Sequence, residues 1–165
     1  MKNIIIVLLI AVLIGAIIYH WKRYQHYGSV TLNLSPTPAV LGQGVYLTVK
    51  FQRGVQEGEL ISGGVLCLRK TWLLNSDDTH NWEQETEILW QKEFSSQVQT
   101  SPEGMFAVFS IELPSNIPQS TGEIASPISS EQKVKPEIAW TARFYPPRTS
   151  VHSGFEFEFE VRGGE

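Results

Sequence analysis

The sequence has little of the material from which most specialised sites are built. It contains one cysteine in 165 residues, so no disulfide can form within the chain and no multi-cysteine zinc or iron–sulfur site is possible. Charged residues make up 18% and hydrophobic residues 42%, the reverse of a disordered chain's composition. The net charge is -4, without a surplus of lysine and arginine, and this disfavours a nucleic-acid-binding protein. The composition and length are those of one folded domain.

Motifs that carry catalysis are also missing. No G-x-S-x-G, H-E-x-x-H or phosphate-loop pattern occurs, and Asp77 and Asp78 are the only aspartates. His80 follows them in a sequence typical of a turn, and His152 stands between serines. Neither histidine has metal ligands or an orienting acid at a recognisable spacing. The sequence therefore predicts a protein that is no enzyme and holds no metal or cofactor, with a hydrolytic enzyme using His80 or His152 as an alternative.

What the sequence does contain is one long apolar run near its beginning. From Ile4 to Tyr19 every residue is apolar except Gly15. Continued through Trp21 the run forms about 27 Å of helix, just enough to cross a hydrocarbon core of about 30 Å. A helix also satisfies every backbone group inside lipid. We therefore predict a transmembrane anchor with its flanks over residues 1–27, followed by a domain over residues 28–165.

The flanks of this run indicate how it is used. Trp21, Lys22 and Arg23 suit the membrane surface, where an aromatic ring and snorkelling charges are stable. Because this bulky, charged sequence is unlike a signal-peptide cleavage site, we predict an uncleaved signal-anchor. A cleaved signal peptide and a buried helix of a soluble fold are the alternatives. Lys2 on one side nearly balances the charges on the other, and we favour an orientation that places the domain outside the cytoplasm.

From Gly28 onward the pattern is that of β-strands. Apolar residues alternate with polar ones in short runs bounded by Gly, Pro and Ser. None of the connections has an apolar period of 3.6 residues, so the crossover helices of a parallel sheet are not expected. The predicted strands are Val30–Leu34, Val45–Phe51, Val65–Trp72, Glu87–Phe94, Ala107–Leu113, Ile138–Phe144 and Phe155–Val161. We predict an all-β fold, an antiparallel β-sandwich of about seven strands.

The last predicted strand has the clearest pattern of all. One face carries three phenylalanines and Val161, and the other carries Glu156, Glu158 and Glu160. The apolar face must meet a core, and the acidic face must meet water or a cationic partner. From residue 28 onward, ten Lys and Arg stand against seventeen Asp and Glu, a net charge of -7 that favours a basic partner. The three glutamates are therefore candidate partner contacts, and a solvated face is the alternative.

Aromatic residues supply a second candidate surface. Trp82 lies in the polar stretch Asn75–Gln84, where we expect an exposed loop, and exposed tryptophan is common at binding hot spots. Trp140 follows the apolar phase of its strand and is predicted to be core. Cys67, between two leucines, is predicted to be buried and inert. The stretch Ser115–Pro136 has loop composition, and a loop this long is functional or mobile.

Two segments carry a resemblance to a known family. Ile138–Phe144 (IAWTARF), followed after a polar stretch by Gly154–Val161 (GFEFEFEV), resembles the closing strands of arrestin-like domains, which are immunoglobulin-like β-sandwiches. A similar sandwich follows an N-terminal membrane helix in bacterial membrane proteins of unknown function. The resemblance implies that fold, a role in interaction and no catalytic residues. With the signal-anchor orientation favoured above, we predict a bacterial inner membrane and a domain on its extracytoplasmic side.

Together these observations predict a single-pass membrane protein whose β-sandwich is a non-catalytic protein-interaction or tethering module. The membrane and a protein partner are the expected contacts, and nucleic acid is not. The alternative is an envelope carbohydrate- or ligand-binding module that uses exposed aromatic residues such as Trp82.

Overall fold

The computed structural model describes residues 12–18, 21, 26–74, 82–121, 136–147 and 154–164, with the backbone alone for Leu74, Trp82 and Glu83. Residues 12–18 are helical. Within the described part of the chain, no helix combines the length and the hydrophobicity needed to cross a bilayer. Much of the predicted anchor, including Lys22 and Arg23, lies outside the described residues. The transmembrane helix therefore stays a prediction.

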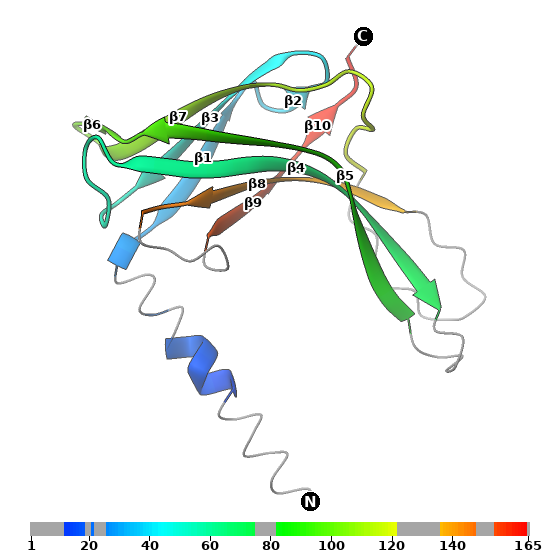
Figure 1. Ribbon diagram of the computed structural model, residues 1–165, viewed down its shortest axis with the longest axis horizontal. Helices are drawn as coiled ribbons and strands as arrows, with labels where there is room; N and C mark the ends of the chain where they lie inside the picture. The colour runs from blue at the N-terminus through cyan, green and yellow to red at the C-terminus, as the bar shows by residue number, and fades with distance from the viewer. Residues whose placement is uncertain are drawn as a thin grey trace, which may run out of the picture.

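The body of the molecule is a β-sandwich of two four-stranded sheets (Figure 1). The strand orders are β1-β3-β7-β6 and β5-β4-β8-β9, and all pairs in both sheets are antiparallel. The predicted antiparallel sandwich is confirmed, with ten strands among the described residues where about seven were expected. The strands are β1 (Val30–Ser35), β2 (Ala39–Val40), β3 (Gly44–Phe51), β4 (Leu60–Leu74), β5 (Trp82–Gln97), β6 (Gln99–Ser101), β7 (Gly104–Glu112), β8 (Glu137–Tyr145), β9 (Phe155–Phe159) and β10 (Val161–Arg162).

The last predicted strand is divided at Glu160. Its first part, β9, pairs antiparallel with β8. Val161 and Arg162 then leave that sheet and pair in parallel with Ala39 and Val40. A parallel pair was not expected, because the sequence has no crossover helix. Here the crossover consists of nearly the whole domain, and the pair closes the end of the sandwich at which the chain terminates (Figure 1).

Strands β4 and β5 are much longer than predicted. They have 15 and 16 residues, and they extend beyond the body as a two-stranded arm (Figure 1). The arm begins where β8 ends its pairing with β4, at Lys70 and Glu137. Trp82 was predicted to lie in a loop, but its backbone pairs with Leu74 at the end of the arm. The predicted strand began at Val65, but Gly63 and Gly64, which precede it, also lie inside β4.

The core lies between the two sheets and consists of the alternate side chains that the sequence pattern selected. Trp140 is buried as predicted, and its indole nitrogen donates a hydrogen bond to the carbonyl oxygen of Pro118 at 3.1 Å. The acceptor belongs to the predicted long loop, of which residues 115–121 are described. Thr121 continues this attachment, because its backbone nitrogen donates to the carbonyl of Ile138 at 3.0 Å. The first part of that loop therefore packs against β8.

Tyr27 belongs to the sandwich, although the predicted boundary placed it in the anchor. The residue is 4% exposed, and its ring stands edge-on to Phe155 with centroids 5.4 Å apart. Its hydroxyl donates to the carbonyl oxygen of Pro147 at 3.3 Å, and its own carbonyl accepts from the backbone of Arg53 at 3.1 Å. Gly28, which follows, has a φ of 68°, a value that favours glycine. The chain is therefore fixed to the body from Tyr27 onward.

Candidate functional site

The outer face of the β5-β4-β8-β9 sheet carries the candidate site. Strand register brings residues of different strands into transverse rows on this face. One row runs through Glu93, Gly64, Arg143 and Glu156, which occupy β5, β4, β8 and β9 in turn. From β5 to β9, the row therefore consists of an acidic residue, a glycine that leaves a gap, a basic residue and a second acidic residue.

The gap exists because β4 has two successive glycines with different surroundings. Gly63 faces the core, where an added Cβ would overlap the ring of Phe94 and lie 2.5 Å from the carbonyl oxygen of Arg143. Gly64 faces outward, where its nearest neighbour would be the carbonyl oxygen of Lys92 at 3.3 Å. Packing thus requires glycine at position 63. Alanine fits at position 64 if the carbonyl oxygen of Lys92 moves by a few tenths of an ångström. A glycine within a strand often marks a place where another molecule's backbone approaches.

A hollow of about 680 Å³ lies over Gly64. Its volume falls within the range of small-molecule and cofactor sites, about 300–1,000 Å³. Apolar and polar side chains from three strands converge on it. The lining consists of Ser62, Gly63, Gly64, Val65 and Leu66 of β4, Ile88, Gln91, Lys92, Glu93, Phe94 and Ser95 of β5, and Arg143 and Tyr145 of β8.

The acidic residues predicted as partner contacts are all paired with cations of this chain. Glu156 accepts from Nε of Arg143 at 3.0 Å, and Glu160 accepts from Nε of Arg162 at 2.8 Å. Glu158 lies 3.1 Å from Nζ of Lys70. Cations of the same chain therefore largely neutralise the negative charge of these three glutamates. Whether the three glutamates also contact a partner stays a prediction.

Lys70 is the most enclosed of these cations. Its Nζ also lies 3.1 Å from Glu137, whose side chain is 10% exposed, so one ammonium group serves two carboxylates. Burial opposes the charge of Lys70, but hydrogen bonds to Glu158 and Glu137 outweigh it, and the pKa of Lys70 lies above its ordinary value. This cluster holds β4, β8 and β9 together where the arm begins.

This geometry predicts a loss of stability at alkaline pH. A raised folded-state pKa means that protonated Lys70 stabilises the fold fully below its unfolded pKa of 10.5, and that this stabilisation disappears as the pH rises through the folded value. Lys70→Met should therefore lower the free energy of unfolding at about pH 8 by about 1–3 kcal/mol, since Glu137 loses its cation. In denaturant titrations at a second, higher pH, above the raised folded-state pKa, the difference from the unchanged protein should shrink.

The control for that experiment is Lys92→Met. Lys92 is an exposed lysine of the same sheet, and it makes no ion pair within the described part of the chain. Its removal should change the free energy of unfolding by less than about 0.5 kcal/mol at both pH values. An equal deficit of the Lys70 variant at both pH values would contradict the assignment.

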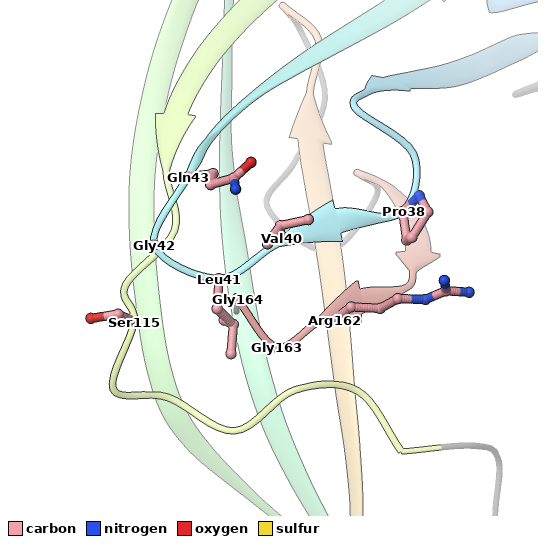
Figure 2. Close-up of a pocket in the computed structure, with 9 residues that line it drawn as sticks. All are labelled: Pro38, Val40, Leu41, Gly42, Gln43, Ser115, Arg162, Gly163 and Gly164. Carbon is pink, nitrogen blue, oxygen red and sulfur yellow. The ribbon is translucent and has the colours of Figure 1, made fainter.

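A second hollow of similar volume, about 680 Å³, lies at the β2–β10 end of the sandwich. Its lining is largely backbone and glycine, including Gly42, Gly163 and Gly164. Figure 2 shows the side chains of Ser115 and Arg162 pointing away from each other, so the polar groups do not converge on one point. Binding sites generally need such convergence. This end is better explained as the closure of the fold, in which the backbone of Leu41 donates to the carbonyl of Arg162 at 3.0 Å.

No family model and no curated protein matches this chain. Solved structures do match it. One of them is Spo0M, a sporulation control protein from Bacillus subtilis, which is 13% identical to this chain and superposes with a TM-score of 0.45. The match covers 83% of this chain and 51% of Spo0M, so the chain spans about half the length of that protein. The resemblance of the closing strands to arrestin-like domains stays a prediction.

The remaining candidate residues from the sequence do not line the hollow or are not among the residues that the structure describes. Trp21 is exposed, whereas Lys22, Arg23, His80 and His152 are not among the described residues. The side chain of Trp82 is not described either, so its contact role stays a prediction. Among the residues that are described, no three His, Cys, Asp or Glu gather as they would around a metal ion.

Cys67 is buried and unpaired, as predicted. Burial raises the pKa of its thiol to about 11, and the nearby positive charge of Arg69 offsets this only in part. Because the thiolate is the reactive form, the folded protein keeps this cysteine inert at neutral pH. The residue serves as a small apolar side chain of the core.

Sequence reasoning missed the residues that surround the hollow. Arg143 and Tyr145 occupy the polar phase of β8, whereas the predicted core followed its apolar phase, which contains Trp140. Glu93 lies in the predicted strand Glu87–Phe94, in which apolar and polar residues do not alternate regularly. One signal was available in the Gly63–Gly64 pair, since glycines inside a strand pattern indicate a close approach of another group.

Proposed function

We propose that this protein is a non-catalytic β-sandwich that binds another protein while an N-terminal apolar helix holds it at a membrane. The binding surface is the outer face of the β5-β4-β8-β9 sheet, centred on Gly64. The observation that carries this proposal is the hollow over Gly64, on which an acid, a base and an aromatic ring converge.

The surface has the mixed character of a protein-binding site. Ile88 provides apolar area, because it is 53% exposed although it is large and hydrophobic. Tyr145 and Arg143 belong to the residue types enriched at interfaces. A surface that combines these groups is suited to a specific contact of moderate strength.

The membrane part of the proposal is supported by the apolar run from Ile4 to Trp21 and by the exposure of its described portion. Val12, Leu13, Ile14, Ile17 and Ile18 are 47–71% exposed. Apolar side chains in such number are normally covered by lipid or protein. We propose a signal-anchor in a bacterial inner membrane, with an arrestin-like sandwich on the extracytoplasmic side. Confinement to the membrane raises the effective concentration of the domain toward membrane partners.

The membrane proposal is tested by fractionation and by reporter fusions. The full-length chain should stay in the membrane pellet after alkaline carbonate washing and enter the soluble fraction with detergent. A periplasm-active reporter fused after Glu165 should give signal, and a cytoplasm-active reporter at the same position should not. Recovery of the chain in the supernatant without detergent would contradict the anchor, and the reverse reporter result would contradict the orientation.

The binding proposal is tested by filling the hollow. Gly64→Val should remove a partner that co-purifies with the full-length chain in detergent, because two methyl groups would occupy the space above β4. Thr86→Val is the matched control, since Thr86 lies on the same outer face of β5, opposite Lys70 and outside the lining of the hollow. Retention of the same partner by Gly64→Val would contradict the assigned surface.

A further inference from the structure

We propose that the hollow over Gly64 receives an extended segment of the partner, which places a basic side chain against Glu93 and an acidic side chain against Arg143. This inference rests on the proposed protein-binding function and specifies the partner's chemistry. It follows from the order of charges across the hollow, from the free capacity of both charged groups and from the polar groups beside them.

The order of charges is set by strand register. Glu93 and Arg143 both pair with Gly64, from opposite sides of β4. Two strand spacings of about 4.8 Å separate their backbones by about 9.6 Å. Residues two positions apart on one face of an extended chain lie about 6.8 Å from each other, and flexible long side chains can cover the remainder. A segment with one basic and one acidic residue can therefore cross β4 in only one orientation that sets the basic residue against Glu93 and the acidic residue against Arg143.

Both charged groups have capacity for a partner. Glu93 is exposed and makes no ion pair with any described residue. Arg143 uses Nε for Glu156, whereas its terminal N–H groups make no hydrogen bond within the described part. An arginine fork can bind a second carboxylate with those groups. A basic group of the partner would give Glu93 an ion pair, and an acidic group would accept hydrogen bonds from the terminal N–H groups of Arg143.

The neighbouring groups favour a polypeptide as the occupant. A peptide backbone brings donors and acceptors that need partners once water is displaced. The hydroxyls of Ser62 and Ser95 and the amide of Gln91 can both donate and accept, and all three line the hollow. Tyr145 stands in the row next to the charged row, where its ring would take an apolar side chain of the segment.

The inference is tested by selecting from a displayed library of random linear peptides on the detergent-solubilised full-length chain. Enriched peptides should carry one basic and one acidic residue two positions apart, on the same face of the extended chain. Glu93→Gln should weaken a selected peptide about three- to fivefold and remove the preference for the basic residue. Arg143→Gln should do the same for the acidic residue. Thr86→Val should change neither affinity nor preference.

Other outcomes overturn the inference, and they show whether the proposed protein-binding function fails with it. Absence of enrichment, or enriched peptides whose affinity ignores both charge variants, overturns it. The proposed function still stands in that case if Gly64→Val removes the co-purifying partner. Retention of oligosaccharides from a glycan array, if lost in Gly64→Val, overturns both. A concentration-dependent dimer that Gly64→Val abolishes makes a second copy of this chain the occupant and overturns the heterologous segment.

Discussion

Replacing Gly63 by alanine is expected to lower the free energy of unfolding by about 3 kcal/mol, the upper part of the range for overpacking a core. The added Cβ would meet the ring of Phe94 and the backbone of Arg143, in a central strand that cannot move aside. Denaturant titration followed by tryptophan fluorescence measures the loss.

The neighbouring glycine is the matched control for this change. Gly64→Ala should leave the free energy of unfolding unchanged or raise it by up to about 1 kcal/mol, because alanine loses less backbone entropy than glycine on folding. The closest atom, the carbonyl oxygen of Lys92, belongs to β5, an edge strand that can shift by a few tenths of an ångström. Equal losses at both positions would contradict the division into a packing glycine and a surface glycine.

Tyr27→Ala is expected to lower the free energy of unfolding by about 3–4 kcal/mol, the cost of removing a large aromatic side chain from a core. The variant loses the ring contacts with Phe51 and Phe155 and the hydrogen bond to Pro147. The same titrations measure the change.

Tyr46→Ala is the corresponding control, because Tyr46 is 55% exposed on β3. Its loss should change the free energy of unfolding by less than about 0.5 kcal/mol. Tyr27→Phe should cost about 1 kcal/mol, the contribution of a single hydrogen bond. A Tyr27→Ala variant as stable as Tyr46→Ala would show that the domain begins after Tyr27, as the sequence alone suggested.

Alternation predicted the core strands well because one buried face imposes a period of two on the sequence. The run from Phe155 to Phe159 shows why, since its phenylalanines pack on the core and its glutamates face outward. The short strands β2 and β6 escaped prediction, and β10 was joined to β9, because two or three residues contain no period of their own. Tyr27 escaped because it was grouped with the aromatic flank of the apolar run, and its buried environment comes from distant residues.

The candidate site depended on contacts that sequence spacing does not encode. Glu158 finds its cation in Lys70, 88 positions earlier, and Glu93 and Arg143 come together only through their common neighbour in β4. The length of β4 was missed for a related reason. Glycines usually interrupt strands, but here one of them is required by the ring of Phe94 on the inner face.

Site-specific photo-crosslinking in intact cells tests the assigned binding surface most directly. A photoreactive amino acid placed at Gln91, on the rim of the hollow, should yield an adduct with one partner protein, and Gly64→Val should abolish that adduct. The same probe at Tyr46, exposed on the opposite sheet, should yield no such adduct. An adduct from Tyr46 with none from Gln91 would place the partner on the other face of the sandwich and contradict the assignment.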